Sequence, residues 1–423
     1  MSGRGALIAT LAVLLVGLSV AVLLGTPWRP LPVQGDGVLV DPARDFTAAQ
    51  IAREDAYHAA VRPPAYASLV VGLVVALVLG LSPLGARLVE AVAAPLGGGW
   101  AWRVLLGGIA VTAVGRVAAL PLDAWSEAVR RRYGLSTRSW GGWWVDIGKS
   151  YGVGLAVTLV VLLGLFALVR WSPQWWWTWG AAGGALLVVV VSFAYPVVVE
   201  PVFNRFTPLP AGELRTSLLE LAERDGVPVR DVLVADASRR TTALNAYVSG
   251  FGATRRIVVY DTLLKRAEPG EVRLVVAHEL GHAKSRDVLW GTLVGALAMA
   301  GVVCALALLL RSEGLLRRAG VGAAGDPRAL ALVLALVAVI VALTGPMQVL
   351  VSRRVEARAD VHALNLTRDP ATFVDMQRRL SVTNLSDLDP PALVFGLFST
   401  HPTGPQRIAL ARDWARLRGV PAP

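Results

Sequence analysis

In Val276-Ala277-His278-Glu279-Leu280-Gly281-His282-Ala283, two histidines lie four residues apart and a glutamate follows the first. On an α-helix, positions i and i+4 lie on one face, so His278 and His282 are suited to bind one metal ion together. Glu279 is turned by about 100° from His278, toward the side of the metal where a bound water would lie. The chain has only five histidines, which argues against a chance pair on a surface helix. The spacing therefore predicts a metal site.

The composition is that of a membrane protein. Of the 423 residues, 55% are hydrophobic and 17% are charged, and the mean hydropathy is +0.56, values that do not suit a soluble protein. The net charge of +11 is spread over short loops without a basic block or a nucleic-acid-binding motif, so we expect no nucleic-acid partner. Cys304 is the only cysteine, which excludes a disulfide framework and a cysteine-ligated zinc site. The preference for arginine over lysine favours a bacterial source with a GC-rich genome.

Seven apolar segments are long enough to cross a bilayer. They are residues 6–24, 66–81, 102–120, 152–169, 175–195, 288–310 and 329–350. The first could be a cleaved signal peptide, but its length and the poor cleavage site after it favour a retained helix. The third contains Arg116, which we expect to face the bundle interior or to extend to the membrane interface. Gly345-Pro346 predicts a kink in the seventh.

The rest of the sequence divides the chain into four parts. The parts are residues 1–196 with five spans, 197–287 as a small domain with the metal motif, 288–351 with two spans, and 352–423 as a polar, largely helical tail.

Local patterns predict the elements between the spans. In the small domain they indicate helices over 211–225 and from 270 to about 286, and strands over 232–234 and 257–260. Before the second span we expect a short amphipathic helix over 46–58, with His58 solvated or at the interface. Between the third and fourth spans we expect a polar loop over 121–151.

Seven crossings put the predicted loop over 121–151, the small domain and the tail on one side of the membrane. The N-terminus is then on the other side. Arg130, Arg131 and Arg132 lie on the side of the small domain, so the positive-inside rule assigns that side to the cytoplasm. Four arginines over 311–328 on the opposite side argue the other way. We expect a multi-pass protein of the bacterial plasma membrane with its metal site toward the cytoplasm.

A catalytic zinc ion takes three protein ligands and keeps one position for water. No third histidine follows the motif at a suitable spacing, so we expect a carboxylate from a second helix. Glu356 is the predicted ligand, and Asp360, one turn later on the same face, is predicted to accept the outer N–H of a liganding histidine. The alternative for the segment with Glu356 and Asp360 is a solvated helix whose charged side chains pair at i and i+4. The position of Glu356 just after the seventh span, opposite the motif just before the sixth, favours the metal site.

Several motifs occur together in a fixed order. They are EPVFNRFTPL at 200–209, NAY at 245–247 with Gly250, IVVYDTLL at 257–264, HELGH at 278–282, Glu356 with Asp360, and STHP at 399–402. Through them, nearly the whole chain resembles the membrane metalloproteases of peptidase family M48 of the Ste24 type, the CAAX prenyl protease 1 family. The resemblance implies an α-helical polytopic membrane protein of about seven transmembrane helices. It also implies a small zincin-like (gluzincin) metalloprotease domain split around the last two spans, and a water-filled chamber that the zinc site faces.

The resemblance implies a catalytic role for the motif residues. One Zn²⁺ per chain is bound by His278, His282 and Glu356, and Glu279 acts as the general base.

Further roles follow from the same resemblance. Asn245, on an edge strand, holds the backbone of a peptide substrate. His401 and Arg407 lie near the cleft, where His401 stabilises the oxyanion of the tetrahedral intermediate and Arg407 binds the substrate. The sequence reads His401-Pro402-Thr403 where eukaryotic members have His-Pro-Pro. His362, two residues after Asp360, is expected to be a structural helix residue.

The sequence thus predicts an integral-membrane zinc metalloendopeptidase that acts on peptide or protein substrates beside or within the lipid bilayer. Its substrates are either prenylated C-terminal peptides, as the family name implies, or unmodified membrane proteins, as for a quality-control protease. The alternative from another class is a zinc-binding transporter or channel. A structural zinc site normally fills all four positions with protein ligands, and the sequence offers no fourth histidine or cysteine at the motif.

Overall fold

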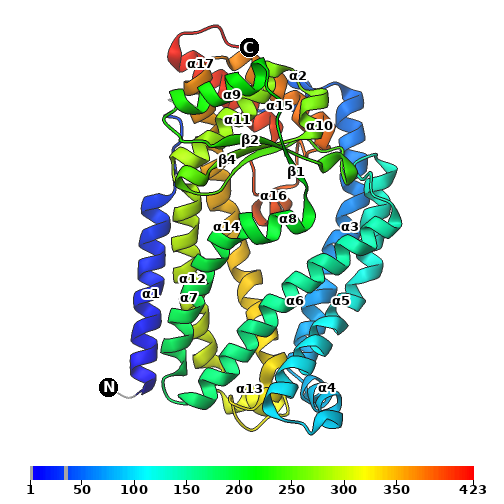
Figure 1. Cartoon of the computed structure of the whole chain (residues 1–423), viewed down its shortest axis with the longest axis vertical. Helices are drawn as coiled ribbons and strands as arrows, with labels where there is room; N and C mark the ends of the chain where they lie inside the picture. Colours follow the sequence, from blue (N-terminus) through cyan, green and yellow to red (C-terminus); the bar gives the residue numbers. More distant parts are fainter. Residues whose placement is uncertain (1–2, 33–36) are drawn as a thin grey trace.

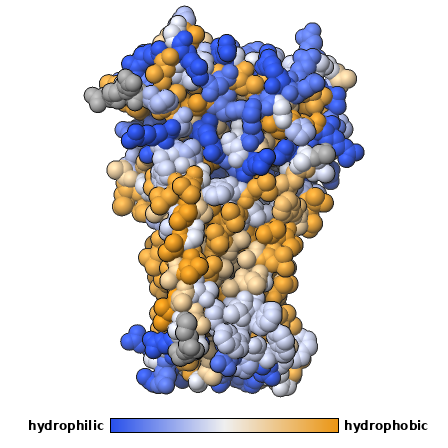
Figure 2. Space-filling model, turned by 90° about the vertical axis from the view of Figure 1, so that its left-hand side faces the viewer, coloured by the Kyte–Doolittle hydropathy of each residue, from blue (hydrophilic) through white to orange (hydrophobic). Residues whose placement is uncertain are grey.

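The computed structural model describes residues 3–32 and 37–423, which form a membrane part and an extramembrane part (Figure 1). Long helices make up the middle and one end of the molecule, and the strands with most of the short helices gather at the other end. Figure 2 shows hydrophobic residues concentrated in a band around the long helices, between hydrophilic surfaces at both ends. This distribution is that of a protein that crosses a bilayer.

Among the described residues, seven helices are long and apolar enough to cross a membrane. They are α1 (Gly3–Gly25), α3 (Ala48–Gly80), α5 (Trp100–Arg132), α6 (Trp140–Trp171), α7 (Trp176–Ala194), α12 (Asp287–Leu309) and α14 (Leu330–Thr367). Each corresponds to one predicted span, so the prediction of a multi-pass membrane protein is confirmed.

The helix α3 is longer than the sequence patterns indicated. It continues through Pro63 and Pro64, so the predicted amphipathic segment and the second span form one helix of 33 residues. Such a helix extends over about 50 Å, whereas the hydrocarbon core of a bilayer is about 30 Å thick. Its start is fixed by a reciprocal cap, in which Thr47 Oγ1 accepts the N–H of Gln50 and Gln50 Oε1 accepts the N–H of Thr47.

Three further helices extend beyond their predicted spans. The polar loop predicted over 121–151 was wrong, because α5 runs to Arg132 and α6 begins at Trp140. Within α5, the guanidinium of Arg116 pairs with the carboxylate of Asp123 at 2.6 Å, so this charged residue of the third span has a partner on its own helix. The helix α14 passes Pro346 and continues to Thr367, which gives it 38 residues and a length of about 57 Å.

The remaining helices are shorter. They are α2 (Pro42–Asp45), α4 (Pro83–Ala93), α8 (Glu200–Phe203), α9 (Glu213–Arg224), α10 (Asp261–Arg266), α11 (Pro269–Lys284), α13 (Glu313–Arg318), α15 (Pro370–Asn384), α16 (Ala392–Phe398) and α17 (Gly404–Arg418). Short 3-10 segments lie at Ala94–Leu96, Ala237–Arg239, Gly252–Thr254 and Pro327–Ala329, and a π-helical turn lies at Tyr195–Val199. The helices predicted over 211–225 and from 270 are confirmed as α9 and α11.

A four-stranded sheet crosses the extramembrane part in the order β1-β2-β4-β3. Its strands are β1 (Phe206–Pro208), β2 (Asp231–Ala235), β3 (Ala246–Ser249) and β4 (Arg256–Tyr260). The strands β2 and β4 contain the two predicted strands and pair in parallel, and the outer pairs are antiparallel. Between β3 and β4, Gly250 has φ 89°, and a Cβ there would lie 2.6 Å from the carbonyl oxygen of Thr254, so the turn requires glycine.

The core of the extramembrane part combines segments from before and after the last two spans. Val232 and Ile257 of the central strands are fully buried and belong to one cluster with Leu280 of α11. The same cluster includes Phe373 of α15 and Trp414 of α17. In Figure 1 the C-terminus lies in this part and the N-terminus lies at the opposite end of the molecule. The small domain and the tail are therefore at one end, as the count of crossings required.

His58 is not solvated, contrary to the first of its two expected positions, and the second, at the membrane interface, stays a prediction. Its side chain is 17% exposed, and its Nε2 lies 2.9 Å from the carbonyl oxygen of Leu385. Tyr57 packs edge-on against the ring of His58. Leu385 comes from the tail of the chain, so the sequence around His58 carries no sign of this contact.

Replacing Asp45 is expected to destabilise the fold. Asp45 and Arg412 have side chains that are 2% and 5% exposed, and Arg378 also contacts Asp45 at 2.8 Å. Asp45→Asn removes the charge that compensates Arg412. Breaking a buried ion pair in this way lowers the free energy of unfolding by about 3–5 kcal/mol. Asp375→Asn is the matched control, because its carboxylate also pairs with Arg378 but is 66% exposed, and we expect less than about 1 kcal/mol. Unfolding of the detergent-solubilised proteins measures both; equal effects would contradict this assignment.

The contribution of the Asp45–Arg412 pair to the free energy of unfolding depends on pH in the acidic range. Burial alone raises the pKa of Asp45, but Arg412 and Arg378 outweigh it and hold the pKa below its usual value. The stabilisation is therefore complete above the unfolded pKa of about 4 and is lost as the pH falls through the folded pKa. The difference between wild type and Asp45→Asn should shrink in that acidic range.

Candidate metal centre

The helix α11 carries the metal motif into the core of the extramembrane part. At its start, the carboxylate of Glu271 accepts the N–H of Glu268 at 2.8 Å and pairs with Arg379 at 2.7 Å. Leu274, Val276, Ala277 and Leu280 are almost completely buried and fix one face of the helix. The chain then turns through Arg286, which has φ 57°, and α12 begins at once. The motif therefore lies directly before the start of the sixth span, α12.

Three side chains converge where α11 faces α14. The Nε2 atoms of His278 and His282 lie 3.1 Å apart. From α14, Glu356 places Oε2 at 3.3 Å from Nε2 of His278 and Oε1 at 3.6 Å from Nε2 of His282. One ligand atom from each residue lies within 4.8 Å of the others. These are the three residues that the sequence and the resemblance indicated as ligands.

The three residues fit a zinc ion. Ligands about 2.0–2.1 Å from a tetrahedral zinc lie about 3.3 Å from one another, close to the separations of these nitrogen and oxygen atoms. Oε2 of Glu356 is buried and accepts no hydrogen bond among the described residues, so a cation would satisfy it. Two nitrogens and one carboxylate oxygen are the donors of a catalytic site that keeps a position open.

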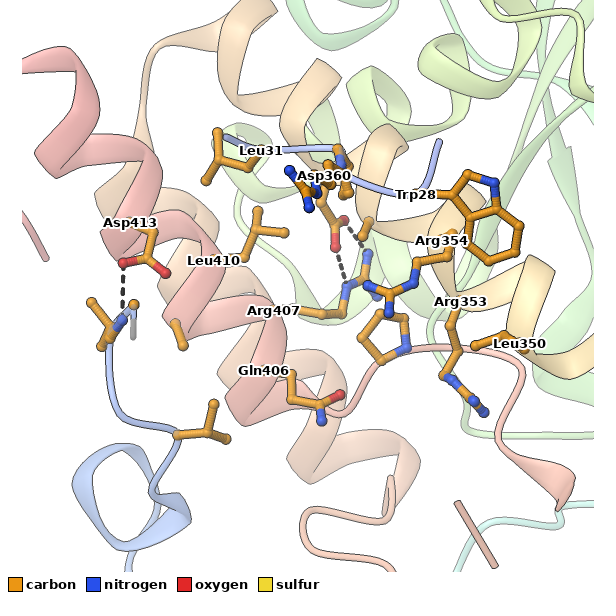
Figure 3. Close-up of a pocket in the computed structure, with 18 of the residues that line it drawn as sticks. Trp28, Leu31, Leu350, Arg353, Arg354, Asp360, Gln406, Arg407, Leu410 and Asp413 are labelled. Atoms are coloured by element: carbon orange, nitrogen blue, oxygen red, sulfur yellow. Dashed lines mark hydrogen bonds and ion pairs between the residues drawn. The ribbon is translucent and has the colours of Figure 1, made fainter. Parts of the chain in front are cut away.

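A buried ion pair orients the first histidine. Nδ1 of His278 donates to Oδ1 of Asp360 at 2.9 Å, which directs Nε2 toward Glu356. Asp360 is fully buried, and Nε of Arg407 donates to its Oδ2 at 2.8 Å. Figure 3 shows the guanidinium of Arg407 on α17 directed at the carboxylate of Asp360 on α14. The outer hydrogen bond predicted for Asp360 is therefore present in the structure.

The second histidine has a partner that sequence reasoning missed. Nδ1 of His282 donates to Oδ2 of Asp287 at 2.8 Å, and Arg358 of α14 pairs with the other oxygen of Asp287. The two histidines thus share one arrangement, in which a carboxylate held by an arginine accepts the outer N–H. An acidic residue at the first position of the next helix was the only signal in the sequence.

Metal binding is expected to tighten as the pH rises. Burial alone lowers the pKa of His278, but the hydrogen bond with Asp360 and the nearby carboxylate of Glu356 outweigh it and raise the pKa to about 10. Near neutral pH the metal-free protein then carries a proton on His278 that must leave when a metal binds. Between about pH 6 and pH 8 the dissociation constant should fall by up to about tenfold per pH unit. Competition with a chelator of known affinity measures it; a constant value over this range would contradict the protonated state.

A cleft of about 670 Å³ opens beside the converging residues. Glu279 and His401 line it together with His278 and Glu356. His401 follows α16, and its Nε2 lies 3.4 Å from Oε2 of Glu356. Burial raises the pKa of Glu279. A carboxylate with a raised pKa beside a metal site is suited to accept a proton near neutral pH.

The other predicted site residues lie on the same cleft. Asn245 is exposed on its wall, immediately before β3, and its carbonyl oxygen accepts the N–H of Tyr260 at 3.0 Å. Arg407 also lines the cleft, although its guanidinium is engaged by Asp360. The structure therefore brings all eight predicted residues to one region. They are Asn245, His278, Glu279, His282, Glu356, Asp360, His401 and Arg407.

His362 lies outside the converging group. Its Nε2 contacts Oδ2 of Asp225 at 3.0 Å. Its ring packs on the middle of the motif, where a Cβ at Gly281 would lie 3.0 Å from Cβ of His362. Glycine at this position allows α11 and α14 to approach closely enough for Glu356 to reach the histidines.

Comparison with known proteins identifies the family. The family described as peptidase family M48 matches residues 208–415, and the one described as CAAX prenyl protease N-terminal, five membrane helices, matches residues 43–205. A Bacillus subtilis (strain 168) protein described as the uncharacterized metalloprotease YhfN is 33% identical over 293 residues, which cover 68% of each chain. The chain belongs to peptidase family M48.

Within this family the chain is a membrane metalloprotease homologous to the CAAX prenyl proteases. The CAAX prenyl protease 1 homolog of Oryza sativa subsp. japonica is 32% identical over 230 residues, which cover 52% of each chain. CAAX prenyl protease 1 of Saccharomyces cerevisiae is 31% identical over 172 residues, 40% of this chain and 38% of that one. The crystal structure of S. mikatae Ste24p shares the fold, with a TM-score of 0.79 at 20% identity, over 97% of this chain and 99% of that one. As a metalloprotease family, M48 implies a metal ion at the site.

Proposed function

We propose that this M48 protein is a zinc endopeptidase that binds one Zn²⁺ per chain through His278, His282 and Glu356. The observation that carries the proposal is the convergence of these ligands, within 4.8 Å of one another, in a cleft that also holds Glu279. When bound, zinc lowers the pKa of a water molecule toward neutrality and polarises a carbonyl group. In this arrangement the three ligands form one side of a zincin-like site and leave the cleft side open.

The chain's own residues move the protons in this proposal. Glu279 accepts the proton of the attacking water and passes it to the leaving amine. His401, whose Nδ1 lies 2.9 Å from Oγ1 of Thr400, donates from Nε2 to the developing oxyanion. Asp360 and Asp287 keep the outer nitrogens of the two liganding histidines protonated, so that both Nε2 atoms face the metal.

An extended peptide is the proposed form of the bound substrate. Among the described strands, β3 pairs only with β4 and is an edge of the sheet. Its free edge offers N–H and C=O groups to a peptide strand. Asn245 lies at the start of this edge and lines the cleft, which supports a contact with the peptide backbone. Arg407 holds Asp360 and completes the wall of the cleft.

For the substrate class we propose C-terminal processing of prenylated peptides, which the curated relatives named CAAX prenyl protease support. The alternative carried over from the sequence is quality control of unmodified membrane proteins. The proposed location is a bacterial plasma membrane with the metal site on the cytoplasmic side, where Arg130, Arg131 and Arg132 lie. The four-part division at 196, 287 and 351 is the proposed domain organisation.

Cleavage of matched peptides tests this function. Purified protein is incubated with a farnesylated C-terminal peptide and with the same peptide unmodified, and products are identified by mass spectrometry. We expect cleavage that stops with a chelator, returns with Zn²⁺ and is absent in Glu356→Gln. A farnesyl-dependent rate supports C-terminal processing, and equal rates support the quality-control class. Cleavage that survives both the chelator and Glu356→Gln would overturn the metal-dependent function.

A further inference from the structure

A second group of carboxylate and imidazole side chains lies where α3 meets the loop after α15. Glu54 and His58 are one turn apart on α3, and Asp387 faces them from the loop. One donor atom from each residue lies within 4.8 Å of the others. None of the three is among the converging ligands of the candidate active site, although Asp387 lies on the wall of its cleft.

The carboxylate of Glu54 is buried without a hydrogen bond. The residue is 3% exposed, and neither oxygen accepts a hydrogen bond among the described residues. Nε2 of His58 lies 3.3 Å from Oε1 of Glu54, but it lies closer, at 2.9 Å, to the carbonyl oxygen of Leu385. A single N–H on Nε2 cannot serve both acceptors. An isolated buried carboxylate is strongly unfavourable, and burial raises the pKa of Glu54 to about 7, so a cation bound here would stabilise the ionised form of this side chain.

The neighbouring arginine does not supply that cation to Glu54. Arg62, two turns further along α3, donates to Oδ2 of Asp387. Asp387 also lies 3.8 Å from the ring of His58, measured from Oδ2 to Nδ1. Arg62 therefore pairs with Asp387, and Glu54, the more deeply buried of the two carboxylates, has no arginine partner among the described residues.

We propose that Glu54, His58 and Asp387 form a second divalent metal site, which binds Zn²⁺ in addition to the ion of the active site. The carbonyl oxygen of Leu385 is the fourth donor, because it lies beside the same nitrogen as Glu54. Donors 2.9 and 3.3 Å apart have the spacing of ligands around a cation with bonds of about 2.0–2.2 Å. Glu54 supplies a negative charge without a cationic partner, Asp387 shares its charge between Arg62 and the ion, and an imidazole favours zinc over calcium or magnesium.

This second ion has a structural role at the edge of the cleft. Ser386 and Asp387 line the candidate active-site cleft from the loop, and Leu385 is buried against Tyr57 of α3. Leu385 ends α15 with φ 48°, a conformation that a non-glycine residue adopts only when its surroundings hold it. The ion joins α3 to this loop and fixes one wall of the cleft relative to the membrane helices.

Metal content tests the site directly. Full-length, tag-free protein in detergent is loaded with Zn²⁺, freed of excess ion and measured by mass spectrometry of the metal. We expect about two zinc ions per chain in the wild type and about one in Glu54→Gln or in His282→Ala, since each variant loses one site. The double variant should hold none. Asp55→Asn, an exposed neighbour on α3, is the matched control and should keep two. Equal zinc content in wild type and Glu54→Gln overturns the proposal.

Thermal unfolding gives a second readout in the His282→Ala background, where only the new site remains. Zn²⁺ should raise the melting temperature of this protein, and adding Glu54→Gln should abolish the rise. Without metal, Glu54→Gln should melt at the same temperature as its parent or higher, because it removes an uncompensated buried charge. A zinc-dependent rise that persists in Glu54→Gln would show that the ion binds elsewhere and would overturn the proposal.

Discussion

Glu279→Gln is expected to lower kcat/KM for peptide cleavage by about 10²–10⁴-fold while leaving the fold and the bound metal in place. Glutamine has the shape of glutamate, but its amide cannot accept the proton of the attacking water. Glu279 lies on the cleft beside the three converging residues and is not one of them, so the metal should remain. Burial raises the pKa of Glu279, which strengthens it as a base in the wild type.

Three measurements separate this effect from misfolding. The cleavage rate, the zinc content and the melting temperature are compared for wild type, Glu279→Gln and Glu223→Gln, an exposed control on α9. Only the cleavage rate of Glu279→Gln should change. If that variant cleaves at close to the wild-type rate, Glu279 is not the general base.

Asp360→Asn is expected to have the largest combined effect on stability and metal affinity. Asp360 is fully buried, accepts from Nδ1 of His278 and pairs with Arg407 through both oxygens. The substituted amide turns an N–H group toward one of these donors and leaves the guanidinium without a counter-charge. We expect a loss of about 3–5 kcal/mol in the free energy of unfolding and a 10–100-fold weaker affinity for zinc, since the outer partner of a ligand is lost.

The measurement compares Asp360→Asn with Asp375→Asn, whose exposed carboxylate also pairs with an arginine. Chelator competition gives the zinc affinity, and denaturant unfolding of the metal-free proteins gives the stability. We expect the control to resemble wild type in both. A variant that keeps wild-type zinc affinity would show that Asp360 does not orient His278.

The sequence predicted the candidate metal centre well because helical spacing fixes geometry locally. His278 and His282 share a face at i and i+4, and Glu356 and Asp360 do the same on their own helix. Asp287 was missed because it lies beyond the turn at Arg286, whose positive φ ends the periodicity of α11. No spacing rule extends across such a turn.

Hydropathy identified the spans but not the full helices. It detects the apolar part of α3, α5 and α14, whereas their polar extensions are stabilised by tertiary contacts. His58 shows the same limit, since its partner Leu385 is 327 positions away in the chain. Charge pairs such as Asp45 with Arg412 also join distant segments, at a separation of 367 positions. Contacts of this kind depend on the fold and leave no local pattern.

Because α14 runs from the span through Pro346 to the candidate site as one helix, we expect the site to respond to the mechanical state of the bilayer. Glu356 lies about 24 Å along the helix from residue 340 near the middle of the span. A tilt of about 5° there would displace the carboxylate by about 2 Å, and helices change tilt when the bilayer becomes thinner or thicker. A displacement of this size is enough to impair catalysis. Cleavage rates in nanodiscs of increasing acyl-chain length should therefore pass through a maximum, so that the lipid composition of the host membrane sets the activity of the enzyme.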